Sequence, residues 1–126
     1  KEALFYENLE NQKVHCFLCR HHCEINDGKR GICGVRENRG GTLYTLVYGF
    51  PCSHHVDPIE KKPLFHFYPG SKAFSIATVG CNFRCRHCQN HEISQIRKDD
   101  GHIYGQRMTP SEVVEGALKS GCKSIS

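Results

Sequence analysis

Apolar residues cluster in three places along the chain, and each place predicts a regular element. Residues 42–48 combine β-branched and aromatic side chains and predict a strand. Residues 73–79 form a short apolar run that suits a buried strand, and Gly80 ends it. Between Thr109 and Gly121, apolar residues recur at helical spacing and predict an amphipathic helix.

Capping signals mark both ends of this helix. Thr109 is the expected N-cap, Pro110 takes the first helical position and Glu112 completes a capping box. Gly121 is the expected stop, and residues 122–126 look like the beginning of a second strand. The apolar face is expected to contain Val113, Val114, Ala117 and Leu118.

A strand, a loop, a helix and a second strand form one βαβ unit, whose parallel strands require a right-handed crossover. One such unit leaves its sheet edge open and its apolar face half covered. We therefore expect an α/β fold in which residues 73–126 are the opening part of a partial (β/α) TIM-like barrel, because a complete barrel needs about 200 residues or more.

Residues 42–72 are expected to be a β-containing linker. Residues 1–41 are expected to be a Cys-rich, metal-binding segment that ends in the turn signal Arg39-Gly40-Gly41.

Composition limits the classes of function. The 126 residues are 38% hydrophobic and 24% charged, which is typical of a globular protein. No apolar run approaches the roughly 18 residues of a membrane span, and no secretory signal opens the chain. We expect a cytoplasmic protein without a membrane partner. The net charge of +4 is too small and too dispersed to predict a nucleic-acid surface.

The nine cysteines change this picture most, because without an export signal they predict metal ligands and not disulfides. Three of them, Cys81-x3-Cys85-x2-Cys88, follow the predicted strand directly, where α/β folds place their chemistry. This spacing lets one loop touch three corners of a [4Fe–4S] cluster and leaves one iron open for an exogenous ligand. A zinc ribbon that pairs Cys85-x2-Cys88 with Cys16-x2-Cys19 is the alternative, but it gives Cys81 no role.

The loop Cys81-Asn82-Phe83-Arg84-Cys85-Arg86-His87-Cys88 resembles the signature of the radical S-adenosylmethionine (SAM) superfamily. With further motifs, the chain is similar to the AmmeMemoRadiSam-system branch, a group related to pyruvate formate-lyase activating enzyme. Those motifs are Cys16-x2-Cys19, the stretch from Gly31 to Arg36, Asp57 to Leu64, His66 to Ser71, and Cys88-Gln89-Asn90.

The resemblance implies an oxidoreductase in which Cys81, Cys85 and Cys88 hold the [4Fe–4S] cluster. SAM would bind the open iron, and its reductive cleavage would give a 5′-deoxyadenosyl radical. An electron donor such as flavodoxin or ferredoxin is implied. By analogy with activating enzymes, a glycine of a partner protein is the implied substrate. The family's main SAM-amino contact lies beyond Ser126, so residues 1–126 alone are expected to bind SAM weakly.

Three further residues of the loop region are candidates for cofactor contacts. His87 stands where the family usually has Tyr or Phe near the adenine of SAM. Gln89 and Asn90 follow the loop and are able to donate hydrogen bonds to SAM or to cluster sulfurs. No catalytic residue is expected beyond the cluster.

The N-terminal segment carries a second candidate metal site. Cys16-x2-Cys19-x3-Cys23-x9-Cys33 supplies four thiols, the number that a closed zinc site or a second iron–sulfur cluster needs. We favour zinc, and free thiols are the other alternative. Nearby substitutes for one cysteine are His15, His21 and His22.

Two other classes of function stay open on the sequence. One is a zinc-ribbon module that binds nucleic acid or protein, and the other is an iron–sulfur electron carrier without SAM chemistry.

His54 and His55 are expected at the surface on opposite faces of a strand. Cys52 and Cys122 are expected to be small buried residues.

Overall fold

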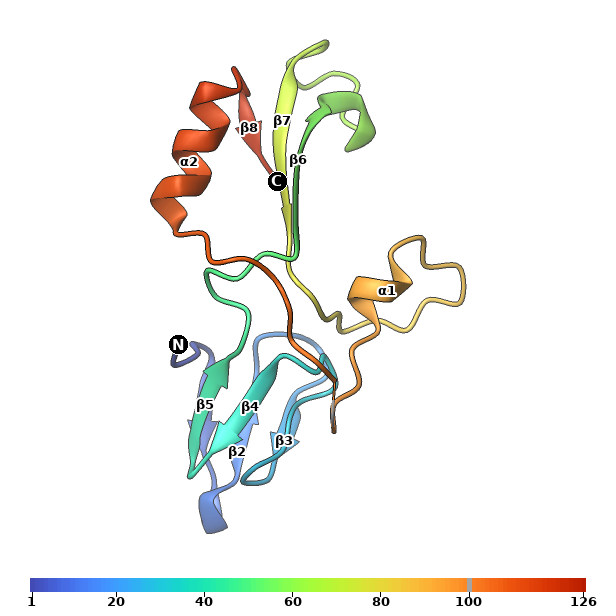
Figure 1. The fold of residues 1–126 in the computed structure, drawn as a ribbon. Coiled ribbons are helices and arrows are strands. Elements are labelled where there is room, and N and C mark those ends of the chain that lie inside the picture. Colours follow the sequence, from blue (N-terminus) through green and yellow to red (C-terminus); the bar gives the residue numbers. More distant parts are fainter. Residues whose placement is uncertain (100) are drawn as a thin grey trace. The chain divides into compact units, whose positions relative to one another are not determined.

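The computed structural model describes residues 1–99 and 101–126 and divides the chain into two units (Figure 1). The first unit contains Lys1–Tyr48 and Val79–Tyr104, and the second contains Gly49–Thr78 and Gly105–Ser126. Within the described residues, no helix has the length and apolar character that crossing a bilayer requires.

The first unit is built from two small antiparallel sheets. The three-stranded sheet contains β1 (Tyr6–Asn8), β2 (Val14–Cys16) and β3 (Cys23–Ile25), in that order. The other sheet is a hairpin of β4 (Arg36–Arg39) and β5 (Thr42–Thr45). The unit also contains the 3-10 helix η1 (Glu10–Gln12) and the short helix α1 (His91–Ser94).

The hairpin turns through two glycines, as the turn signal predicted. Gly40 and Gly41 have φ angles of 60° and 84°, and Arg39 pairs with Thr42 on either side of them. A two-residue hairpin of this kind requires positive φ at both central positions, where glycine is not penalised. Strand β5 ends at Thr45, three residues earlier than the predicted strand.

The core of the first unit is small and depends on strand alternation. Val14 and Cys16 are buried on β2 while His15 between them is only partly buried, as period-two alternation requires. They pack with Ile25 of β3 and Leu43 of β5. The cluster therefore joins the two sheets through a few side chains.

A buried amide supports this core. Asn38 is fully buried, and its Nδ2 donates hydrogen bonds to the carbonyl oxygens of Gln12 and Ile25, at 2.7 and 2.8 Å. Its Oδ1 accepts a hydrogen bond from the N–H of Gly41 at 2.9 Å. One side chain thus satisfies backbone groups from η1, β3 and the β4–β5 turn.

The second unit contains one mixed sheet with a helix against it. The sheet has the order β6 (Ser53–Pro58), β7 (Lys72–Ala77) and β8 (Ser124–Ile125). The 3-10 helix η2 (Ile59–Lys61) follows β6, and helix α2 (Pro110–Lys119) lies alongside β7 and β8 (Figure 1).

Helix α2 begins and ends as predicted. Thr109 Oγ1 accepts a hydrogen bond from the N–H of Glu112, whose carboxylate accepts one from the Thr109 N–H, so the capping box is complete. Gly121 adopts φ 67° just after the helix. The predicted apolar face is too wide, because Val114 and Leu118 are 48% and 72% exposed.

The core of this unit is formed by the narrower helix face. Val113 and Ala117 pack against Phe74 of β7, and Met108 and Cys122 lie beside them. Cys52 and Cys122 are both only partly buried, and His54 and His55 are exposed on β6, as expected for the histidines.

The predicted (β/α) TIM-like barrel is wrong. Strands β7 and β8 are parallel and α2 connects them, but they share only two residue pairs, and β6 pairs with β7 antiparallel along six. The sheets of the described residues are therefore mostly antiparallel and no barrel forms. Residues 42–72 were expected to be a β-containing linker, and the antiparallel pairing of residues 53–58 with β7 was not predicted. Pro58 is compatible with this pairing because it stands at the last position of an edge strand.

A carboxylate in the second unit is held by two lysines and a serine. Lys61 Nζ and Lys62 Nζ lie 2.8 and 3.5 Å from the carboxylate oxygens of Asp57, and Ser75 Oγ donates to Oδ2 at 2.6 Å. The hydrogen bond from Lys61 and then that from Ser75 hold the pKa of Asp57 well below its usual range.

We expect Asn38→Ala to destabilise the protein by about 2–4 kcal/mol, because it leaves buried carbonyls and an N–H without partners. Urea unfolding followed by circular dichroism measures the loss. Asn26→Ala is the control, because Asn26 is exposed, and it should change the free energy of unfolding by less than about 0.5 kcal/mol. Equal effects of the two substitutions would contradict the role given to Asn38.

We also expect Asp57→Asn to make unfolding less sensitive to acid. A carboxylate with a lowered folded-state pKa stabilises the fold above its unfolded pKa of about 3.9, and this contribution disappears as the pH falls towards the folded value. Urea midpoints measured from about pH 6 to about pH 2 should therefore fall more steeply for the wild type than for the variant. Glu115→Gln, at an exposed pair with Lys119, should keep the wild-type slope.

Candidate metal centre

The cysteine loop begins at a glycine that packs tightly against the N-terminal region of the first unit. Gly80 has φ 89°, and a Cβ there would lie 2.4 Å from Val35 Cγ1 and 2.7 Å from the carbonyl oxygen of Cys33. Its N–H donates a hydrogen bond to the Ile93 oxygen at 2.8 Å. Because any side chain would clash, Gly80 is required to start the loop beside Cys33.

The three predicted cluster ligands lie in an irregular stretch between Gly80 and α1. Cys81 and Cys88 are partly buried and Cys85 is exposed, and all three are free thiols. The N–H of Phe83 donates to Cys81 Sγ at 3.4 Å, and Cys88 Sγ lies 3.3 Å from the hydroxyl of Ser94. Two of the three sulfurs therefore already have polar neighbours.

Arg84 ties this loop to the rest of the first unit. Its guanidinium donates to Gln95 Oε1 at 2.9 Å and to the Ile32 oxygen at 3.1 Å. Gln95 Nε2 in turn donates to the Phe83 oxygen at 3.3 Å. These bonds connect the loop to α1 and to the stretch that precedes Cys33.

The donor set fits an iron–sulfur cluster, although the thiols are not gathered around one point. Among the described residues, no group of three or more His, Cys, Asp or Glu side chains is arranged to hold a metal ion. Three accessible thiols within one irregular loop, with an N–H directed at one sulfur, are nevertheless the ligands that such a cluster takes. Ligation requires the loop to close around the cluster.

The three candidate cofactor contacts are all exposed. His87 and Gln89 lie on the loop surface, and Asn90 is the residue before α1, without a side-chain capping bond. Their side chains are therefore accessible beside the cysteines.

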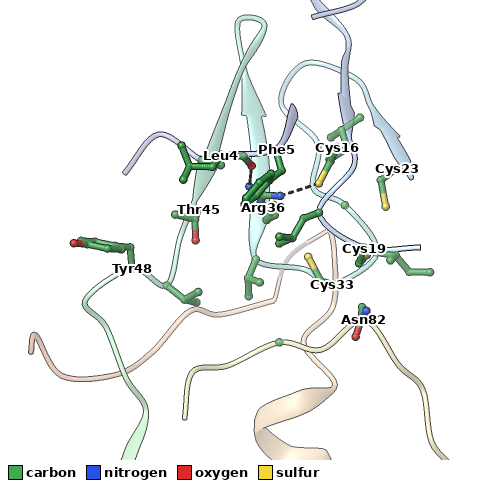
Figure 2. Close-up of a pocket in the computed structure, with 18 of the residues that line it drawn as sticks. Leu4, Phe5, Cys16, Cys19, Cys23, Cys33, Arg36, Thr45, Tyr48 and Asn82 are labelled. Atoms are coloured by element: carbon green, nitrogen blue, oxygen red, sulfur yellow. Dashed lines mark hydrogen bonds between the residues drawn. The ribbon is translucent and has the colours of Figure 1, made fainter. Parts of the chain in front are cut away.

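The four N-terminal cysteines lie around one cavity of the first unit, which has a volume of about 650 Å³. Cys16 and Cys23 face each other on β2 and β3, and Cys19 lies in the turn that connects these strands. Cys33 comes from the stretch before β4, and Figure 2 shows its sulfur across the cavity from that of Cys16. Cys81 also lines this cavity.

Burial raises the pKa of the Cys33 thiol, and the neighbouring Cys23 and Cys16 raise it further. Without a bound cation, Cys33 is therefore held in its neutral form. A metal ion reverses this preference, because a coordinating thiol is deprotonated.

The histidines that the sequence offered as substitute ligands have other partners. His15 Nδ1 lies 2.8 Å from a carboxylate oxygen of Glu7, and its ring stacks on His22. His21 Nε2 lies 2.6 Å from the Asn82 oxygen. The four cysteines remain the candidate ligands.

The sequence did not identify Arg36 as part of this cavity. Arg36 is 7% exposed, and its guanidinium donates to Cys16 Sγ at 2.9 Å and to the Leu4 oxygen (Figure 2). Neither of these partners is a carboxylate, whereas Arg30 forms an ion pair with Glu37 at 2.8 Å. The available signal was the alternation of β4, which buries positions 36 and 38.

We expect Arg84→Ala to loosen the cysteine loop, because it removes the bonds to Gln95 and to the Ile32 oxygen. Amide hydrogen exchange of residues 81–95 should become at least about fivefold faster. Arg86→Ala is the matched control within the same loop, since Arg86 is exposed and no side-chain hydrogen bond is found for it among the described residues. Unchanged exchange in the Arg84 variant would contradict this role.

The chain is similar to two proteins of Methanocaldococcus jannaschii. Uncharacterized protein MJ0808 is 53% identical over 126 residues, which cover 100% of this chain and 37% of that protein. Uncharacterized protein MJ0674 is 30% identical over 94 residues, which cover 74% of this chain and 23% of that protein. No family model matches the chain, and no solved structure matches it. The chain thus spans little more than a third of the length of MJ0808, and neither relative's name states an activity.

Proposed function

We propose that this chain is the cluster-binding part of a radical SAM oxidoreductase, with Cys81, Cys85 and Cys88 as the ligands of a [4Fe–4S] cluster. The observation that carries the proposal is the cysteine loop itself. Three free thiols at the signature spacing, one exposed and two partly buried, follow a tightly packed glycine in a loop without regular structure. The remaining cysteines of the chain do not share this spacing.

The surroundings of the loop suit thiolate ligands. The N–H of Phe83 donates a hydrogen bond to Cys81 Sγ, and the hydroxyl of Ser94 lies close to Cys88 Sγ. Such bonds tune the potential of a cluster. Cys85 is exposed, so it is free to move when the loop closes.

Three protein ligands leave one iron for an exogenous molecule. When bound, the cluster supplies the electron for reductive cleavage of SAM to a 5′-deoxyadenosyl radical. The chain contributes ligation, orientation and exclusion of water. His87, Gln89 and Asn90 are exposed next to the ligands, and in this proposal they contact SAM.

The proposal includes two partners. A one-electron donor such as flavodoxin or ferredoxin reduces the cluster, and a protein glycine is the substrate by analogy with activating enzymes. Because the chain spans 37% of MJ0808, the test requires the full-length protein that contains it.

Full-length protein, reconstituted anaerobically with iron and sulfide, should cleave SAM to 5′-deoxyadenosine after reduction with dithionite. The variants Cys81→Ala, Cys85→Ala and Cys88→Ala should each lose at least about 100-fold in this rate, since even outer partners of metal ligands cost 10–100-fold. Liquid chromatography measures the product, and EPR measures the change of the reduced cluster signal on addition of SAM.

Cys52→Ser and Cys122→Ser are the matched controls, because both cysteines belong to the second unit. They should cleave SAM at the wild-type rate. A cluster whose EPR signal does not change when SAM is added would favour an iron–sulfur electron carrier. A protein that binds zinc but no iron would favour a zinc-ribbon module. Either result would refute the proposed activity.

A further inference from the structure

We propose that Cys16, Cys19, Cys23 and Cys33 hold a second, polynuclear iron–sulfur cluster, and not a single zinc ion, with Arg36 as its buried counter-charge. This assignment replaces the zinc that the sequence favoured. It does not depend on SAM chemistry, because none of the four cysteines belongs to the proposed catalytic loop.

The backbone places the four thiols around one volume. Cys16 and Cys23 are directly paired across β2 and β3, so their Cα atoms are about 4.5–5.5 Å apart. Cys19 lies in the short connection between these strands, and Cys33 approaches from the stretch before β4. All four line the same cavity, and none is in a disulfide.

The separation of the thiols around this cavity favours a cluster over a single ion. Four sulfurs bound to one zinc at about 2.3 Å lie within about 4 Å of each other. Over residues 1–99 and 101–126, no three candidate ligands are gathered in such a way. The thiols instead lie on the walls of a cavity of about 650 Å³. A four-iron cubane takes thiolates that are more widely separated, because its ligands attach at separate outer corners.

The buried charge of Arg36 points independently to an anionic occupant. Arg36 is 7% exposed, and in the described part of the chain it forms no ion pair with a carboxylate. A buried charge without a counter-charge is costly. Its hydrogen bonds go to the Leu4 carbonyl and to Cys16 Sγ, so its donors are satisfied without a carboxylate partner. Four thiolates around an iron–sulfur core carry net negative charge, and they supply the missing partner.

The rest of the cavity wall suits a cluster. Its lining includes the apolar side chains Leu4, Phe5, Leu18, Ile25 and Val35. Leu4, Phe5 and Leu18 are themselves exposed, so the cavity opens to solvent on this side. Solvent exposure and hydrogen bonds to sulfur both set the potential of a cluster. The N–H···S contact from Arg36 to Cys16 is a bond of this type.

The decisive experiment counts metals in the full-length protein after anaerobic reconstitution. The wild type should contain about eight iron ions per chain, and the triple variant Cys81→Ala/Cys85→Ala/Cys88→Ala about four, with an iron–sulfur absorption and EPR spectrum. Adding Cys16→Ser and Cys23→Ser to the triple variant should remove this remaining iron. Cys52→Ser in the same background is the matched control and should retain it.

The result separates this inference from the proposed function. If the triple variant holds zinc and no iron, or no metal, the second cluster is refuted while the catalytic loop is unaffected. If the wild type and the triple variant both contain about four iron ions, the N-terminal cluster is supported and the catalytic cluster is refuted. If the variants fail to fold, the metal content of the wild type is the deciding measurement. About eight iron ions per chain support two clusters, whereas about four iron ions with one zinc ion refute the inference.

The role of Arg36 has its own readout in the triple variant. Arg36→Gln should lower the midpoint reduction potential of the remaining cluster and reduce its iron content, because positive charge and an N–H···S bond favour the reduced form. Arg36→Lys should restore part of both. Arg39→Gln changes an exposed arginine of the same strand and should leave the potential unchanged. Equal potentials for all three variants would refute Arg36 as counter-charge.

Discussion

The close approach of Gly80 to Val35 and to the carbonyl of Cys33 is the constraint on which the arrangement of the first unit depends. It joins Val79–Tyr104 to Lys1–Tyr48 although the second unit's residues separate them in the sequence. Because no side chain fits at this position, the backbone of Gly80 itself packs against the Val35 side chain and the Cys33 carbonyl. Hydrogen bonds from Arg84 to the Ile32 oxygen and from Arg30 to the Gly101 oxygen reinforce the same junction.

The charged groups of the two units are balanced in different ways. In the second unit, Asp57 has two lysines and a serine as partners, so its negative charge is satisfied by the protein alone. In the first unit, Arg30 has a carboxylate partner in Glu37, whereas the buried Arg36 donates to a carbonyl and to a cysteine sulfur. The proposed N-terminal cluster would supply a negative charge next to Arg36, and its binding would then contribute to folding.

Local signals predicted local structure well. The capping box at Thr109 and the glycine turn at Gly40-Gly41 are confirmed, because each depends on backbone rules that act within a few residues. The barrel was wrong because strand pairing is not local. The sequence of residues 53–58 contains no local signal for their antiparallel pairing with β7. The cysteines were visible as candidates from spacing alone, but the burial of Arg36 beside Cys16 became visible only in three dimensions.

The exposure of Cys85 also makes the loop sensitive to oxygen. An accessible thiol without a ligand is open to oxidation, first to a sulfenic acid and then to a disulfide with a neighbouring thiol. Cys88, three positions further on and only partly buried, offers such a neighbour. Once that bond forms, the loop has lost two of the three thiols that the proposed cluster requires, until a reductant restores them. Under the proposed function, exposure to air before reconstitution would therefore lower the fraction of molecules that can bind the cluster.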